Sequence, residues 1–234
     1  MDLTKQSKIE LDSIIAKVKR GISTYFLDEK RIEIIHNILK KQNINHNIFY
    51  PYEGATYGVI YSNTPNVSLI KIISEEKLTH SSIMGSLYSL NLKKEIFGDI
   101  IIDKYCYVLV ISHMKDYIIN NIYQIGNTKV LLEECNLNEI KEYKQIYELY
   151  TTTVTSERLD AVISKIIGTS RNIILEKLKN KEIVLNYEIA TKSSYLLKEG
   201  DIFSIRRYGK YKYLGVTSKS KKDKYIIEYQ KYAN

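Results

Sequence analysis

The most restrictive feature of this sequence is the succession of apolar patterns between residues 67 and 135. Strand-like and helix-like segments follow one another at 67–73, 79–92, 99–103, 105–111, 115–125 and 129–133. The second and fifth have the spacing of amphipathic helices, and the others have the short apolar runs of strands. The order is therefore β, α, β, β, α, β. It predicts an antiparallel sheet with both helices on one face.

This order is that of the split βαβ arrangement in ferredoxin-like and RNA-recognition-motif (RRM-like) folds. We predict a central βαββαβ domain of this kind at residues 67–150, in a chain of the α+β class. RRM sheets expose aromatic side chains that stack on RNA bases. Tyr105 and Tyr107 alternate on one predicted strand and could do so, but we favour a half-buried tyrosine face.

Ahead of this domain, residues 1–66 predict a smaller domain with helices and strands. Apolar residues recur at helical spacing from about residue 3 to residue 20, and Gly21 provides a stop. Asp28 is suited to N-cap a second helix. Short strands are expected at 47–52 and 57–61, before a boundary loop at 63–66.

The last third, residues 157–234, predicts two short helices packed on a small β-sheet. The first helix ends at Gly168, and Ser170 can N-cap the second, in which Ile173 and Ile174 are expected to face the core. Strands are expected at 183–185 and 202–206. Residues 136–156 are expected to be a connector, in which the Thr151 to Thr153 run and Thr155 suggest an extended strand or a linker.

The net charge of +8 is concentrated in this last third. Residues 157–234 hold 17 Lys and Arg against 9 Asp and Glu, a net +8, whereas residues 1–156 hold 18 of each. Such a division is typical of a chain with a polyanion-binding domain at one end. The alternative is a lysine-rich face that is merely solvated.

Charge and position identify candidate RNA contacts in this third. Arg171 follows the Ser170 cap, where free backbone amides of a helix start favour phosphates. Packing is expected to bring this helix start near the basic residues of the last strands. The expected RNA-binding residues are Arg158, Ser170, Arg171, Lys177, Lys179, Lys181, Arg206, Arg207 and Lys210. The lysine run at 218–224 looks flexible and is expected to contribute little.

Residues 158–201 resemble the S4 domain family, which binds structured RNA. The matching positions are Arg158, Leu159, Asp160, Ser170, Arg171, Ile183, Leu185, Asn186, Gly200 and Asp201. The family usually has a glycine where Lys181 stands, so this helix exit needs a conformation that non-glycine residues disfavour. The family's frequent Asn–Gly turn is Asn186–Tyr187 here.

The remainder of the chain resembles the YlmH-like group of S4 proteins, at Tyr25 to Asp28 and from His80 to Ile102. Ser81 and Ser82 replace the usual Arg and Asp after the histidine, and Thr56 and Tyr57 replace a usual Glu–Arg pair. The resemblance implies association with the large ribosomal subunit in translation quality control. Its implied partners are rRNA and, as a further candidate, tRNA.

No catalytic or metal-binding pattern accompanies these features. The sequence lacks GxGxxG, phosphate-loop and GxSxG motifs, its four histidines are isolated, and Cys106 and Cys135 are expected to be buried thiols. We therefore expect a non-catalytic, monomeric, cytoplasmic RNA-binding protein without cofactor, metal or membrane span. The alternatives are an RNA-modifying enzyme with an S4 targeting domain, and a membrane-surface adaptor that uses its basic end.

Overall fold

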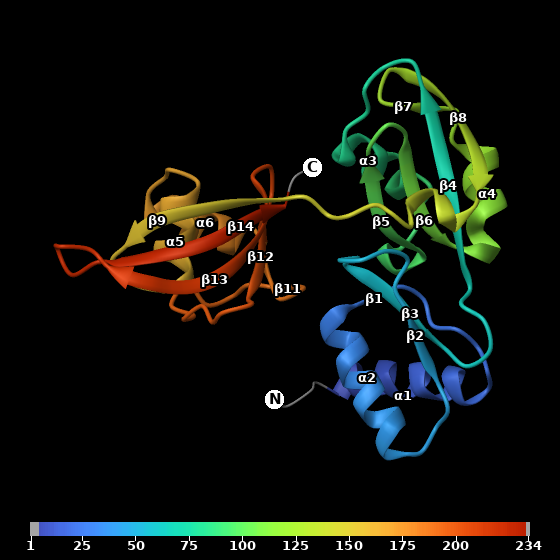
Figure 1. The fold of residues 1–234 in the computed structure, drawn as a ribbon, viewed down its shortest axis with the longest axis horizontal. Helices are drawn as coiled ribbons and strands as arrows, with labels where there is room; N and C mark the ends of the chain where they lie inside the picture. Colours follow the sequence, from blue (N-terminus) through green and yellow to red (C-terminus); the bar gives the residue numbers. More distant parts are fainter. Residues whose placement is uncertain (1–4, 233–234) are drawn as a thin grey trace. The chain divides into compact units, whose positions relative to one another are not determined.

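A computed structural model describes residues 5–232, and the chain divides into two compact units, Met1–Lys144 and Gln145–Asn234 (Figure 1). Each unit has its own buried apolar clusters. Helices and antiparallel sheets are mixed in both units. The predicted α+β class is therefore confirmed at the level of mixed helices and several sheets. Among the described residues, no helix is long and apolar enough to cross a membrane.

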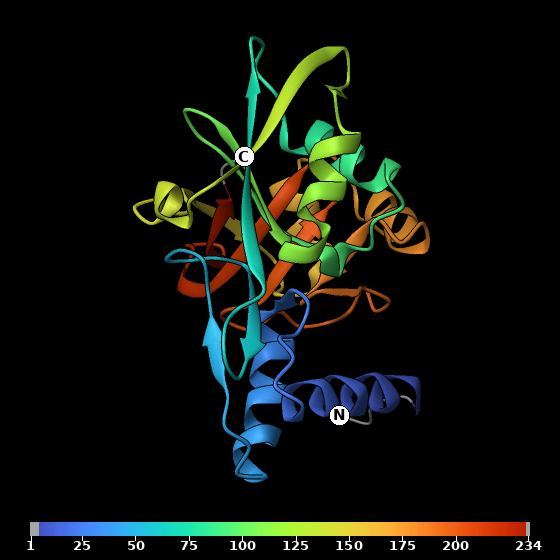
Figure 2. The same ribbon diagram turned by 90° about the vertical axis from the view of Figure 1, so that its right-hand side faces the viewer.

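The N-terminal part of unit 1 packs two helices on a short sheet. Helix α1 (Lys5–Lys19) lies across α2 (Glu29–Lys41), as Figure 2 shows. Gly21 follows α1 with a φ of +77°, and Asp28 accepts a 2.9 Å hydrogen bond from the backbone N–H of Arg31. Both predicted helix signals are confirmed. The sheet has the order β1–β3–β2, with bounds Leu27–Asp28, Tyr57–Tyr61 and Asn47–Phe49.

The second sheet of unit 1 has the order β5–β6–β4–β8–β7. Its strands are β4 (Val67–Ser74), β5 (Phe97–Ile102), β6 (Cys106–Ile111), β7 (Gln124–Ile125) and β8 (Thr128–Cys135). Two α-helices, α3 (His80–Ser89) and α4 (Lys115–Asn121), and the 3-10 turns η1 (Lys94–Ile96) and η2 (Ser112–Met114) lie between the strands. The helix expected at 115–125 ends at Asn121, because Gly126, with a φ of +60°, turns the chain and pairs β7 with β8.

Both faces of this sheet are covered. Side chains of α3 and α4, such as Ile83 and Ile118, pack on one face. On the other face, Phe26 and Ile140 of the turn η3 (Leu137–Ile140) pack in one cluster with Tyr107, which is 7% exposed. The Tyr107 hydroxyl donates a 3.1 Å hydrogen bond to Glu139. Tyr107 is therefore a core residue and is closed to a base, which agrees with the interpretation we favoured.

Unit 2 packs two helices on a six-stranded sheet (Figure 1). The helices are α5 (Leu159–Ile166) and α6 (Arg171–Lys179). The sheet has the order β11–β10–β12–β13–β14–β9, with bounds Glu188–Ile189, Ile183–Leu185, Ile202–Ile205, Gly209–Lys219, Tyr225–Tyr232 and Tyr147–Val154. Its core joins Val162 and Ile174 of the helices to Phe203, Tyr213 and other strand residues.

Three details of unit 2 differ from expectation. The connector at 136–156 contains β9, which pairs with β14 along its whole length, so the sheet begins before residue 157. The run at 218–224 is an ordered turn closed by hydrogen bonds between Ser220 and Lys224. Ile173 is 43% exposed, because it lies on the outer side of α6, whereas Ile174 is buried.

Candidate nucleic-acid interface

Arg158 lies at the start of α5 and is held by a buried carboxylate. Its Nε and one terminal nitrogen donate to the two oxygens of Asp160 at 3.1 and 2.9 Å. Asp160 is 4% exposed, whereas the Arg158 side chain is 40% exposed. The Arg158 guanidinium lowers the pKa of Asp160, against the opposing effect of burial. One edge of the Arg158 guanidinium is thus bound to Asp160, and the rest of the side chain is accessible to solvent.

The start of α6 has the geometry that the sequence predicts. The Ser170 hydroxyl accepts a 3.4 Å hydrogen bond from the backbone N–H of Ile173 and caps the helix. Arg171 is exposed in the first turn, where the positive end of the helix dipole faces outward. One terminal nitrogen of Arg171 donates to the Thr155 hydroxyl at 3.1 Å. This contact orients the guanidinium beside the helix start.

The end of α6 differs from expectation at Lys177. This side chain is only 17% exposed and forms a 2.8 Å ion pair with Glu182. The pKa of Glu182 is lowered, first by the hydrogen bond from Lys177 and also by the charges of Arg206 and Arg207. Lys177 is therefore a structural partner of Glu182 more than an exposed phosphate contact. Lys179 and Lys181, by contrast, are exposed.

Lys181 occupies the position after the helix where glycine is usual. Its φ is +58°, and the N–H groups of Lys181 and Glu182 bond to the carbonyls of Leu178 and Lys177 at 3.1 and 2.9 Å. This is the Schellman pattern of helix ends. After α5, the Thr169 N–H bonds to the Ser164 carbonyl at 2.9 Å, and Gly168 has a φ of +67° that suits glycine. The expectation of a disfavoured conformation at Lys181 is confirmed.

The turn between β12 and β13 brings basic residues to the end of α6. We call Arg206, Arg207 and Tyr208 the Arg206 turn. The Arg206 N–H donates to the Glu182 carbonyl at 2.9 Å, and Lys177 Nζ lies 5.3 Å from the Tyr208 ring centroid. The Arg206 turn therefore lies beside the C-terminal end of α6. The sequence predicted that these arginines would lie near the helix start, and that prediction is wrong.

The expected RNA-binding residues consequently fall into two groups. Arg158, Ser170 and Arg171 lie at the helix starts, whereas Lys177, Lys181, Arg206 and Arg207 lie at the end of α6. At a rise of about 1.5 Å per residue, the length of α6 separates the groups by about 12 Å. Lys210, which follows the Arg206 turn in β13, has its Nζ 4.4 Å from the Tyr232 ring centroid and 5.5 Å from the Tyr187 ring centroid.

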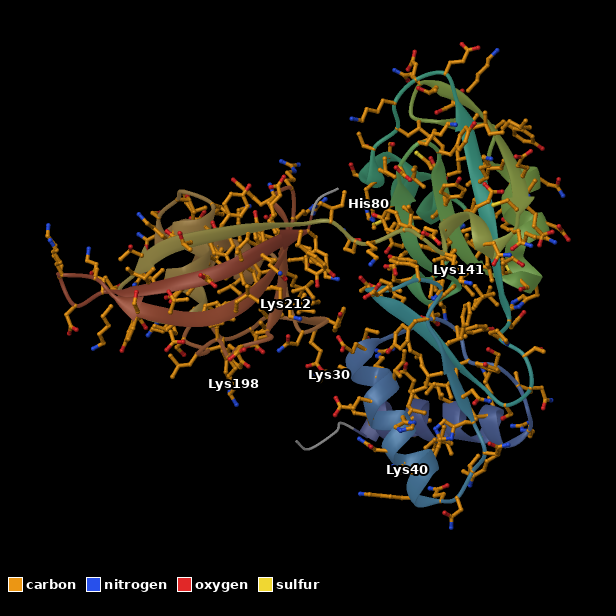
Figure 3. All side chains as sticks on the ribbon, in the orientation of Figure 1. Lys30, Lys40, His80, Lys141, Lys198 and Lys212 are labelled. Carbon is orange, nitrogen blue, oxygen red and sulfur yellow. The ribbon has the colours of Figure 1, made fainter. Side chains whose placement is uncertain are left out.

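Two residues that carry the S4 resemblance hold the fold together. Asn186 donates to Asp201 at 2.8 Å and accepts from the N–H of Ile202 at 2.9 Å. Asp201 is buried and also accepts from the N–H of Lys198, which precedes β12 (Figure 3). This network ties the β10–β11 hairpin to the turn before β12. Asn186 and Asp201 therefore act in folding, and the exposed basic residues remain for contact with a ligand.

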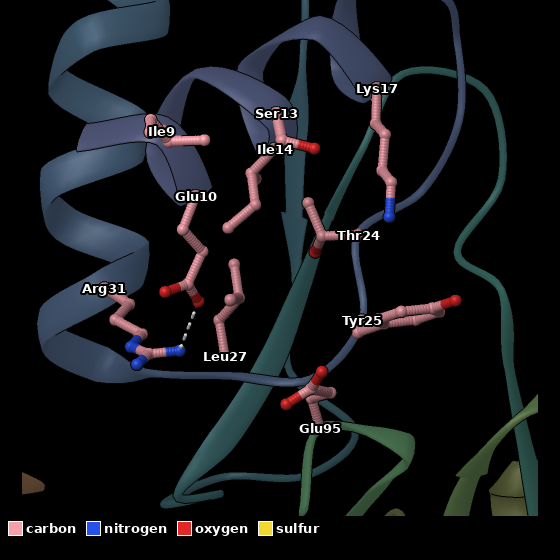
Figure 4. A pocket seen from close by; sticks show the side chains of 10 residues that line it. All are labelled: Ile9, Glu10, Ser13, Ile14, Lys17, Thr24, Tyr25, Leu27, Arg31 and Glu95. Carbon is pink, nitrogen blue, oxygen red and sulfur yellow. Dashed lines mark hydrogen bonds and ion pairs between the residues drawn. The ribbon is translucent and has the colours of Figure 1, made fainter. Parts of the chain in front are cut away.

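Unit 1 holds a pocket of about 450 Å³ beside α1 (Figure 4). Its charged lining residues are Glu10, Lys17, Arg31 and Glu95, whose formal charges cancel. Arg31 is paired with Glu10 at 3.3 Å, and Lys17 Nζ lies 4.7 Å from the Tyr25 ring centroid. A phosphate would find no excess of positive charge in this pocket.

Among the described residues, no three His, Cys, Asp or Glu side chains gather in a group that could hold a metal ion. Burial raises the pKa of the Cys135 thiol to about 12, so it is a poor nucleophile. Cys106 is buried as expected, whereas Cys135 is only partly buried. His36 and His46, expected to be isolated, share a hydrogen bond of 2.8 Å between their ring nitrogens.

Known proteins are similar to part of this chain. Residues 66–139 match the family described as "Putative RNA-binding domain in YlmH". The ribosome-associated protein quality control protein P2 of Bacillus subtilis (strain 168) is 31% identical over 153 residues. The chain is YlmH-like. The aligned region is 65% of this YlmH-like chain and 60% of the relative, so it spans less than two thirds of the relative's length.

Among solved structures, the cell division protein ylmH from Streptococcus pneumoniae is 16% identical to this YlmH-like chain, with a TM-score of 0.49. The match covers 61% of this chain and 98% of the other.

The positions that depart from the YlmH-like pattern have local structural partners. The backbone N–H groups of Thr56 and Tyr57 donate to the Asp99 carboxylate at 2.8 and 3.4 Å. Ser82 and Thr79 cap α3 reciprocally, each side chain bonding the other's backbone N–H at 3.1 Å. In this YlmH-like chain, Ser82 therefore supplies a helix cap.

Proposed function

We propose that this chain is a non-catalytic protein that binds structured RNA in a ribosomal context. The observation that carries the proposal is the location of the charge: unit 2 presents exposed arginines and lysines, and the net +8 belongs to residues 157–234. A surface of this kind attracts phosphates and releases their counterions. The family described for residues 66–139 and the name of the B. subtilis relative support the ribosomal context.

The finer parts of the proposal concern the partner and the contacts. We propose rRNA of the large subunit as the main partner, with tRNA as a second candidate. Both groups of basic residues would face the RNA: Arg158 and Arg171 at the helix starts, and Lys181, Arg206 and Arg207 at the end of α6. Lys179 and Lys210 border the second group in this proposal. The two groups would contact separate phosphates, because the length of α6 lies between them.

The architecture of the proposal has three domains. Residues 1–66 form the N-terminal domain, residues 67–150 a ferredoxin-like (RRM-like) domain, and residues 157–234 an S4 domain. The strand order β5–β6–β4–β8 and the two helices on one face support the second of these. Two helices packed on a small sheet support the third. We propose that β9, at residues 147–154, is added to the S4 domain, so that the second domain ends at residue 144 instead of 150.

A binding experiment with the full chain tests the proposal. Purified ribosomal subunits and transcribed fragments of large-subunit rRNA would be titrated at several salt concentrations. We expect the affinity to fall steeply with salt, because each neutralised phosphate releases a counterion. An affinity that does not change with salt would contradict the electrostatic part of the proposal. An affinity that is equal for both ribosomal subunits would contradict the large-subunit part.

Single substitutions identify the surface. Arg171→Ala should weaken binding on the order of tenfold, because a planar guanidinium can bind a phosphate through two hydrogen bonds. Lys222→Ala, at the tip of the β13–β14 hairpin, is the matched control and should have a small effect. If Lys222→Ala abolishes binding while Arg171→Ala preserves it, the hairpin tip is the binding site.

The alternative of an RNA-modifying enzyme predicts a thermal shift with S-adenosylmethionine, which we do not expect.

A further inference from the structure

We infer that Tyr208 is a base-stacking residue, which receives an unpaired RNA base at the Arg206 turn. This inference rests on the proposed RNA-binding function and adds to it the kind of RNA recognised. Tyr208 is 41% exposed, whereas Phe203, Tyr211, Tyr213 and Tyr229 of the neighbouring sheet are buried. An exposed aromatic ring beside arginines is the usual composition of a site for single-stranded RNA.

The backbone around Tyr208 is fixed on both sides. Its N–H donates to the Ile205 carbonyl at 2.9 Å, and its carbonyl accepts from the Tyr211 hydroxyl at 2.8 Å. Ile205 and Gly209 pair across the base of the turn. A base that stacks on this ring would therefore meet a residue whose position is set before binding, which lowers the entropic cost of association.

One cation lies against the ring, and two arginines precede it in the chain. Lys177 Nζ lies 5.3 Å from its centroid and is held there by the 2.8 Å ion pair with Glu182. Arg206 and Arg207 precede it in the turn, and both are exposed. Arg206 and Arg207 would hold the phosphates on either side of a nucleotide whose base lies against Tyr208. The occupant that fits is thus an unpaired nucleotide in a loop, a bulge or a single strand.

Arg207 adopts a backbone conformation that L residues rarely take. Its φ is +72°, in the left-handed region. Such residues gather at functional sites, where the surrounding structure holds them. Here the ladder of β12 with β13 and the Arg206–Glu182 hydrogen bond hold the turn. The conformation is part of the fixed backbone of the Arg206 turn next to Tyr208.

The test uses the full chain and two RNA probes that share one stem. The first probe closes the stem with an unpaired loop, and the second is the same stem as a blunt duplex. Fluorescence anisotropy would give the affinity for both at several salt concentrations. Tyr208→Leu should weaken binding to the looped probe roughly 5- to 100-fold, the effect of losing one stacked base. Binding to the blunt duplex should not change, and Tyr208→Phe should retain wild-type affinity.

Salt dependence separates stacking from charge. Tyr208→Leu should leave the slope of log K against log salt unchanged, because no phosphate contact is lost, whereas Arg207→Gln should reduce it by about one. Tyr150→Leu is the matched control, because Tyr150 is 40% exposed in the same sheet, next to Glu148 rather than arginines. It should preserve both affinities.

Two results would overturn the inference: unchanged affinity of Tyr208→Leu for the looped probe, or an equal loss on both probes. If the wild-type chain binds neither probe nor ribosomal RNA, the proposed function itself fails.

Discussion

The carboxylate of Asp160 and the guanidinium of Arg158 form a two-point ion pair, at 2.9 and 3.1 Å, at the first turn of α5. The backbone N–H groups of Leu159 and Asp160 bond to the carbonyls of Tyr195 and Ser193 at 2.8 and 3.1 Å. The pair thus stands where the start of α5 meets the segment that leads to β12. Because Asp160 is buried, its charge depends on Arg158.

We expect the stability of unit 2 to fall in acid because of this pair. The pKa of Asp160 is lowered in the folded state, first by its hydrogen bond with Arg158, whereas an unfolded aspartate titrates near about 3.9. The stabilisation is therefore complete above about pH 4 to 5 and is lost as the pH falls through the folded-state pKa. Thermal unfolding of the wild type and of Asp160→Asn between pH 3 and pH 7 measures this effect. The variant should be less stable at pH 7 by about 1–3 kcal/mol and should depend less on pH. Parallel pH profiles would contradict the assignment.

Lys181→Gly should stabilise unit 2. At a φ of +58°, a non-glycine residue carries a conformational cost that glycine avoids, and the gain should be about 1 kcal/mol. The matched reverse change is Gly168→Lys, at the equivalent position after α5, where a Cβ would meet open space. It should destabilise by a similar amount, because only the backbone strain is added. Urea unfolding of the two variants checks both signs, and a destabilised Lys181→Gly would show that the lysine side chain contributes more than its backbone costs.

Gly98→Ala should destabilise unit 1 by about 1–3 kcal/mol through overpacking. A Cβ at Gly98 would lie 2.8 Å from Cε1 and 2.9 Å from Cδ1 of the buried Phe26 ring. Phe26→Leu alone should also destabilise, because it removes buried aromatic surface. Combined with Gly98→Ala, it should cost less than the sum of the two changes, since the smaller side chain makes room for the Cβ. A double-mutant cycle measures this coupling, and additive losses would show that the cost of the Cβ does not arise from the Phe26 ring.

A fragment of residues 145–234 should fold, and one of residues 157–234 should be much less stable. The shorter fragment lacks β9, which pairs with all eight residues of β14 and helps to cover Tyr229. Far-ultraviolet circular dichroism with heating compares the two fragments. RNA binding by the isolated unit should be measured on the longer one, because a loss of binding in the shorter one would report unfolding. Equal melting temperatures would show that β9 is dispensable.

Local signals in the sequence predicted the helix boundaries well. Asp28, Gly21 and Gly168 act as predicted because a cap or a left-handed glycine depends on a few neighbouring residues. Strand β9 could be predicted only in part, as the extended strand or linker suggested by the threonines at 151–155. Residues 147–154 pair with residues 225–232, far along the chain, and the mostly exposed β9 has no apolar alternation.

The same limit applies to the candidate site. Helical spacing places Lys177 on an exposed face, but the chain turns back after α6 and supplies Glu182 as its partner. The position of the Arg206 turn depends on the pairing of β10 with β12, which the sequence does not specify. Tyr208 was overlooked, although an aromatic residue directly after two arginines in a turn is a recognisable signal.

Strand β9 also influences how the protein behaves in concentrated solution. Among the described residues, no strand pairs with its outer edge, and it contains neither proline, lysine nor a bulge, the usual features that block strand addition. Leu149 is 61% exposed on this strand. We therefore expect purified unit 2 to self-associate reversibly through added β-structure as its concentration rises. Leu149→Lys, which places a charge on this edge, should then reduce the self-association.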